Sequence, residues 1–173
     1  MAAAELRDLA EIYGSSFPAI QSAMEILGRH NPDMARSVIE VPGEGNSVFV
    51  FLTDRDDPAD TRKTLGVKIG SEKELSAWEI GYIMERKNLL RLLDRMRGSS
   101  FHPIRKSLEI FRQKYSKLDL AEYEINVMRE ADSLSVSFTD KNRTDVFGGG
   151  KYVEFEVKLN SADLSVIKSH FIR

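Results

Sequence analysis

The stretch GSSFPAIQSAMEIL (residues 14–27) recurs as GSSFHPIRKSLEIF (residues 98–111), 84 positions further along the 173-residue chain. The first four residues are identical, and apolar residues then fall at matching places in both stretches. Self-similarity at a fixed spacing is the sequence signature of a repeated structural unit. The two stretches therefore predict that the chain contains two related copies of one unit.

The similarity continues in the same order beyond these stretches. VKIGS (67–71) matches VKLNS (157–161) at a spacing of 90. At a spacing of 86, four residues of the first copy are identical to their counterparts in the second: Ser47, Val50, Thr53 and Asp54 match Ser133, Val136, Thr139 and Asp140. We predict copies at residues 1–84 and 85–173, forming either two domains or one compact pseudo-symmetric domain.

Apolar spacing predicts the elements of each copy. A short amphipathic helix comes first, carried by Leu6, Leu9 and Ile12 in one copy and by Leu89, Leu93 and Met96 in the other. GSSF then marks the end of this helix and the start of a second one over 17–27 or 101–115. About four antiparallel strands follow, as in YEINVM, SLSVSF, KYVEFEVKL and LSVIKSHFI, where apolar and polar residues alternate. The predicted fold is α+β, with helices packed on the sheets.

This order of elements, with GGGKYVEFEVKL before a last strand LSVIKSHFIR, resembles the cystatin-like and nuclear-transport-factor-2-like group, and small bacterial domains of that kind. In that group a long helix lies across a curved antiparallel sheet. The resemblance rests on element order and pattern, so it implies a fold and transfers no functional residue.

Composition narrows the classes of protein that we consider. Hydrophobic residues make up 42% and charged residues 30% of the chain, which is typical of a soluble globular protein. The absence of cysteine excludes disulfides, zinc thiolate sites and thiol nucleophiles. No run approaches the roughly 18 apolar residues of a membrane helix. We therefore expect a cytoplasmic protein without a membrane contact.

The two copies differ in the strand that follows the first hairpin turn. VFVFL (48–52) carries Phe49 and Phe51 where its counterpart carries Ser135 and Ser137. Two neighbouring Phe side chains on one strand face need a cover, which the same chain, a second subunit or an external partner could supply. Ile26 and Ile110 stand about 200° around their helices from the core positions and suggest a second contact surface; the alternative is an isolated exposed Ile.

Residues 85–117 contain ten Lys and Arg residues but only three acidic ones. Arg105 and Arg112 are two of the ten basic residues. Such a segment fits an acidic protein partner, an acidic part of the same chain, or a solvated face. We expect no nucleic-acid partner, because the aromatic residues of the segment are needed for the core.

No pattern predicts catalysis or a bound metal. Asp54, Asp56, Asp57 and Asp60 lack the spacing of a calcium loop, and the three histidines lie too far apart in sequence for a metal site. No serine stands in a nucleophile elbow. We therefore predict no catalytic residue, no metal and no cofactor.

These observations favour a non-enzymatic protein-interaction module, immunity-like or inhibitor-like, that binds a protein partner or a second copy of itself. The candidate interface residues are Phe49, Phe51, Ile26, Ile110, Arg105 and Arg112. The alternative is a small-ligand-binding protein or hydrolase with a pocket between helix and curved sheet. The candidate pocket residues are Trp78, Tyr82, Asp140 and His170.

Overall fold

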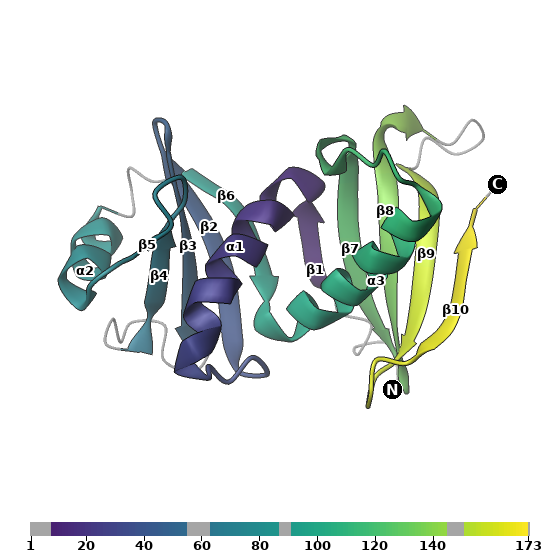
Figure 1. The fold of residues 1–173 in the computed structure, drawn as a ribbon, viewed down its shortest axis with the longest axis horizontal. Helices are drawn as coiled ribbons and strands as arrows, with labels where there is room; N and C mark the ends of the chain where they lie inside the picture. Colours follow the sequence, from purple (N-terminus) through teal and green to yellow (C-terminus); the bar gives the residue numbers. More distant parts are fainter. Residues whose placement is uncertain (1–7, 55–62, 87–90, 145–150, 173) are drawn as a thin grey trace, which may run out of the picture. The chain divides into compact units, whose positions relative to one another are not determined.

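A computed structural model describes residues 8–54, 63–86, 91–144 and 151–172 (Figure 1). The protein has an α+β fold in which antiparallel strands dominate, as predicted. The chain divides into two compact units. Unit 1 comprises Met1–Ser15 and Ser100–Arg173, and unit 2 comprises Ser16–Ser99. The described part contains no helix with the length and apolar character needed to span a membrane.

Unit 2 contains five antiparallel strands of the sheet, with helix α1 (Phe17–Leu27) packed against β3 and β4. The strand order is β6-β2-β3-β4-β5. The bounds are β2 (Ser37–Glu44), β3 (Ser47–Asp54), β4 (Leu65–Lys68), β5 (Lys73–Glu74) and β6 (Arg91–Arg97). A second helix, α2 (Ala77–Glu85), follows β5. The 3-10 turn η2 (Gly28–His30) extends the end of α1.

Unit 1 likewise contains five strands, in the order β10-β9-β8-β7-β1, with α3 (Phe101–Lys114) packed against β7, β8 and β9. The bounds are β1 (Asp8–Tyr13), β7 (Tyr123–Glu130), β8 (Ser133–Thr144), β9 (Lys151–Asn160) and β10 (Val166–Phe171). The core beneath α3 is aromatic: the Phe111 ring lies 4.6 Å from Phe138 and 4.7 Å from Phe155, measured between ring centroids.

The hydrogen-bonding registers of the strands in the two units correspond. Ile39 pairs with Leu52 in unit 2, and Ile125 pairs with Phe138 in unit 1, at a constant spacing of 86 positions. All the β2–β3 pairs in the described register have such a counterpart between β7 and β8. The match extends to the outer strand, because the pairs of β2 with β6 reappear as pairs of β7 with β1.

The two leading amphipathic helices were predicted wrongly, because the structure has strand β1 at Leu9 and Ile12 and strand β6 at Leu93 and Met96. The other two residues of the prediction, Leu6 and Leu89, lie outside the described residues. Each strand contains a register shift of one residue, between Asp8 and Ala10 in β1 and between Leu92 and Asp94 in β6. Such a bulge adds one residue to the strand and interrupts its period of two. The apolar residues then recur about every third position, and this spacing imitates a helix.

The helices predicted over 17–27 and 101–115 are confirmed as α1 and α3, and the four strands predicted in the second copy are confirmed as β7 to β10. The sequence pattern missed α2, which stands where a last strand of the first copy was expected. Its start carries a recognisable signal, Ser76 followed by Glu79, the serine and glutamate of a capping box.

The repeated GSSF does not end a helix; the chain passes from a strand into a 3-10 turn there, η1 (Gly14–Ser16) or η5 (Gly98–Ser100). A Cβ atom on Gly14 would stand 2.0 Å from the backbone oxygen of Leu120, and one on Gly98 would stand 2.7 Å from that of Met34. Only glycine allows this approach of two backbones. Both unit boundaries fall inside the same motif, after Ser15 and after Ser99.

Candidate functional site

Helix α2 covers Phe49 and Phe51, the two side chains that distinguish β3 from β8. The Phe side chains are 7% and 6% exposed and form a cluster with Leu75 and with the buried Ile80 of α2. Their rings stack 6.3 Å apart. Of the covers considered for these residues, the structure therefore has the one within the chain, and neither ring is available at the surface for a partner.

The first turn of α2 is fixed by polar contacts. The Ser76 hydroxyl accepts a hydrogen bond from the Glu79 amide (3.2 Å), and the Glu79 carboxylate accepts one from the Ser76 amide (2.8 Å). Lys73 donates to the same carboxylate over 2.7 Å. The hydrogen bond from Lys73 and those from Ser76 lower the pKa of Glu79 to about 2. This helix start is thus held by a carboxylate that stays ionised well into the acid range.

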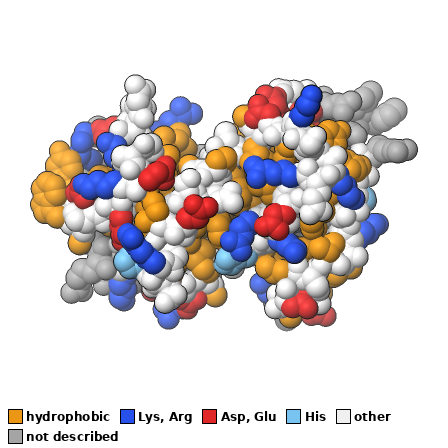
Figure 2. Space-filling model, in the orientation of Figure 1, with side chains coloured by type: hydrophobic (Ala, Val, Ile, Leu, Met, Phe, Trp, Pro, Cys, Tyr) orange, Lys and Arg blue, Asp and Glu red, His pale blue; other side chains and the backbone are white. Residues whose placement is uncertain are grey.

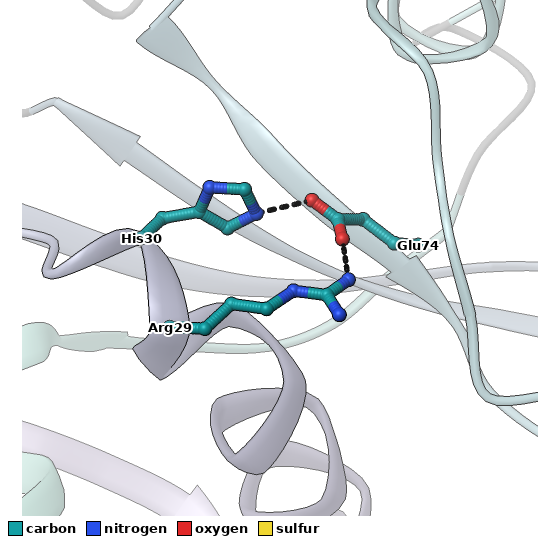
Figure 3. Close-up of polar contacts among 3 residues, drawn as sticks. All are labelled: Arg29, His30 and Glu74. Carbon is teal, nitrogen blue, oxygen red and sulfur yellow. Dashed lines mark hydrogen bonds and ion pairs between the residues drawn. The ribbon is translucent and has the colours of Figure 1, made fainter.

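A second carboxylate joins the segment before α2 to the end of α1. Glu74 accepts a hydrogen bond from the Arg29 guanidinium, and its other oxygen lies 2.5 Å from His30 Nε2 (Figure 3). The hydrogen bond from Arg29 is the main cause that lowers the pKa of Glu74. Because Glu74 lies two residues before Ser76, these contacts tie the start of α2 to η2.

The outer face of α2 carries an aromatic ladder, formed by Trp78, Tyr82 and Arg86. Trp78 is 75% exposed and Tyr82 is 49% exposed. Their rings stack with centroids 5.6 Å apart and planes only 11° from parallel. The Arg86 guanidinium lies 5.6 Å from the Tyr82 ring centroid and also pairs with Glu44. Figure 2 shows hydrophobic side chains gathered over the position of α2.

Trp78 and Tyr82 were predicted to line a pocket between helix and sheet, but they lie on the exposed side of their helix. The inward position is taken by Ile80, which packs on the Phe pair. The ladder itself was missed because α2 was missed. Residues at i, i+4 and i+8 become neighbours only once the segment is known to be helical.

Comparison with family models, curated proteins and solved structures found no match. The candidate site therefore rests on the geometry of this chain alone.

The other two candidate pocket residues lie in unit 1. Asp140 stands opposite Tyr123 in the strand register and accepts a hydrogen bond from the amide of Asn142 over 2.8 Å. His170 lies on β10, beside Glu156 of β9. Burial and a hydrogen bond to Glu154 raise the pKa of Tyr123, which keeps its hydroxyl protonated. Asp140 thus lies within β8, where its carboxylate bonds the backbone at the register shift that precedes Thr144.

The remaining interface candidates lie on α1 and α3. Ile26 and Ile110 are half-buried, whereas Arg105 and Arg112 are exposed on α3. The Arg105 guanidinium lies 5.7 Å from the centroid of the Phe101 ring. Among the residues that the structure describes, no group of three or more acidic or histidine side chains is placed to hold a metal ion.

Proposed function

We propose that this protein is a non-enzymatic protein-interaction module whose partner docks on the aromatic ladder of α2. The observation that carries the proposal is the 75% exposure of Trp78 in a helix that is otherwise well anchored. Trp, Tyr and Arg are the residue types most enriched among those that dominate binding energy at protein interfaces. The ladder brings one of each together.

The ladder is ordered before any partner arrives, which supports its use for binding. Stacking holds the Trp78 and Tyr82 rings against each other, and the capping box with the buried Ile80 holds the helix. Side chains that are already ordered lose less conformational entropy on association, so more of the contact energy is expressed as affinity.

Gly81 supports a close approach by the partner. It lies between the ladder residues in sequence, and a Cβ atom added to it would meet nothing within 4 Å. A glycine within a helix costs about 1 kcal/mol relative to alanine, and here packing inside the chain does not require it. A partner that approaches the helix backbone at Gly81 would require that no side chain stands there.

The contact expected at this surface is mainly apolar. The cation of the ladder, Arg86, and its neighbour Lys73 are already paired within the chain, Arg86 with Glu44 and Lys73 with Glu79. We therefore infer a partner protein with an apolar groove that accepts the two rings, and a binding affinity that changes little with ionic strength.

We further propose that the two units descend from one duplicated α+β unit. The constant spacing of paired residues, the shared bulge in β1 and β6, and the two GSSF turns support this. One helix packed on an antiparallel sheet in each unit also supports the resemblance to the cystatin-like group as a fold. An immunity-like or inhibitor-like role would be one use of the ladder.

The test compares capture of binding proteins by the wild-type chain and by the Trp78→Ala and Tyr82→Ala variants, followed by calorimetric titration with the purified partner. Loss of either ring is expected to weaken binding at least about fivefold, the effect of an interface residue that costs about 1 kcal/mol when truncated. Thermal stability should hardly change, because both rings are exposed.

Tyr13 provides the matched control, because it is as exposed as Tyr82 but lies on β1 of unit 1. Tyr13→Ala should retain the partner. A partner held equally well by all three variants would show that the ladder is not the docking surface. Self-association that disappears with Trp78→Ala would identify the partner as a second copy.

A further inference from the structure

Unit 2 contains a pocket of about 320 Å³ at the end of its sheet. Its walls come from the segment after α1, from the end of β3 and from the start of β4. The apolar part is formed by Pro32, Leu52 and Leu65. The polar part is formed by His30, Asp33, Arg36, Ser37, Thr53, Asp54 and Lys63.

The same place in unit 1 is packed with aromatic rings. The strand registers set Ser37 opposite Asp54 in unit 2 and Tyr123 opposite Asp140 in unit 1. They likewise match Leu52 with Phe138 and Leu65 with Phe155, three positions where unit 1 has the larger side chain. The rings of Tyr123, Phe138 and Phe155 all pack on Phe111. At three positions of its wall, the pocket thus has smaller side chains than those that unit 1 carries at the corresponding positions.

The charge at this place also differs between the units. Arg36 of the pocket corresponds to Glu122, 86 positions later, whereas Asp54 and Asp140 are the same residue type. The segment just before Arg36 or Glu122 makes the same turn in both units. Asp33 accepts a hydrogen bond from the Ala35 amide, as Asp119 does from the Ala121 amide. One acidic residue of the pocket thus belongs to the turn, and Asp54 pairs with Arg36 at 3.9 Å.

We propose that this pocket is a binding site for a small organic anion, a molecule with one carboxylate or phosphate group on an apolar body. The Arg36 guanidinium and the Lys63 ammonium recognise the anionic group. Leu52, Leu65 and Pro32 hold the apolar body, since ligand pockets combine an apolar lining with a few placed polar groups. The site is separate from the ladder and is independent of the function proposed there.

Four probes test the proposal on the full chain by amide NMR titration: benzoate, phenyl phosphate, and the uncharged analogues benzamide and phenol. The anions should give saturable shifts confined to residues 30–37, 52–54 and 63–65. The stronger of the two anions distinguishes a carboxylate ligand from a phosphate ligand. Arg36→Gln with Lys63→Gln should weaken binding of that anion at least about tenfold, by loss of charge-assisted hydrogen bonds.

A second variant copies the packing of unit 1 into unit 2. Ser37→Tyr with Leu65→Phe should fill the pocket and abolish the shifts, while the remaining amide spectrum shows that the chain is folded. Arg105→Gln with Arg112→Gln removes the same charge from α3 and should leave binding unchanged. Equal binding of the anions and their uncharged analogues would overturn the proposal. Binding that survives in the filled variant, or shifts that do not saturate, would also overturn it.

Discussion

The hydroxyl of Ser16 donates a hydrogen bond to the carboxylate of Asp94, a side chain that is only 7% exposed. The corresponding pair in unit 1 is Ser100 and Ala10, each 84 positions from its counterpart. There the buried Ser100 hydroxyl has no hydrogen-bond partner among the described residues. The two units thus contain the same serine, half-buried beside a carboxylate in unit 2 and fully buried without one in unit 1.

Replacing Asp94 should therefore cost more than removing the Ser100 hydroxyl. Asp94→Ala is expected to lower the free energy of unfolding by about 1–3 kcal/mol, because the half-buried Ser16 hydroxyl loses a charged acceptor. Ser100→Ala should be neutral or slightly stabilising, because no hydrogen bond is lost. Urea unfolding followed by circular dichroism measures both, and equal losses in the two variants would contradict the assignment.

The two turn glycines should not tolerate a side chain. Gly14→Ala and Gly98→Ala each place a methyl group against a backbone oxygen, and we expect each to lower the free energy of unfolding by at least about 2 kcal/mol. Gly28 is the matched control, because its Cβ would meet nothing within 4 Å and its backbone is already helical. Gly28→Ala should raise stability by about 0.5 kcal/mol. Unchanged melting of the first two variants would refute the close approach.

Acid should loosen the start of α2. The pKa of Glu79 is about 2 in the folded chain, below its usual 4.5, so its contribution to stability is complete above the usual value and declines as the pH falls toward 2. Melting temperatures of the wild type and of Glu79→Gln, measured from pH 7 to pH 2, test this. The difference between them should shrink on acidification; a difference that is constant over this range would exclude the carboxylate as its source.

The buried Phe pair on β3, Phe49 and Phe51, should contribute strongly to the free energy of unfolding. Phe49→Ser with Phe51→Ser copies the sequence of β8, and the loss of two buried rings should cost on the order of 5 kcal/mol. Phe51 also lies against Gly66, its partner on β4, so its removal would expose that backbone. Met128→Ser on β7 is a control, because Met128 is exposed. If the double variant has the same melting temperature as the wild type, α2 does not cover the pair.

The parts of the fold that a single segment encodes could be predicted from the sequence. Helix α3 and strands β7 to β10 contain runs of regular apolar spacing, despite register shifts in the pairings of β8, β9 and β10, and these runs were sufficient. Strands β1 and β6 could not be recognised, because a bulge shifts the period and Asp94 is buried where an apolar residue was expected. Their pairings also join distant segments, and such contacts leave no trace in a local pattern.

The candidate sites were harder to predict for two different reasons. The ladder depends on α2, a helix of nine residues whose inward face is reduced to Ile80 and its partly buried neighbours. The pocket depends on side chains that are small, and only comparison of Ser37 with Tyr123 and of Leu65 with Phe155 in a known register shows what is missing. A difference in volume becomes visible only when both units are aligned in space.

The pairing of β1 with β7 sets an order for folding during synthesis. Ile12 leaves the ribosome more than a hundred residues before its partner Ile125, whereas every strand of unit 2 has been made once Arg97 emerges. Contacts between such distant residues form slowly, and an unpaired strand edge invites association with other chains. We therefore expect unit 2 to fold first on the nascent chain. Strand β1, the first described strand to be synthesised, is then among the last to pair in the sheet.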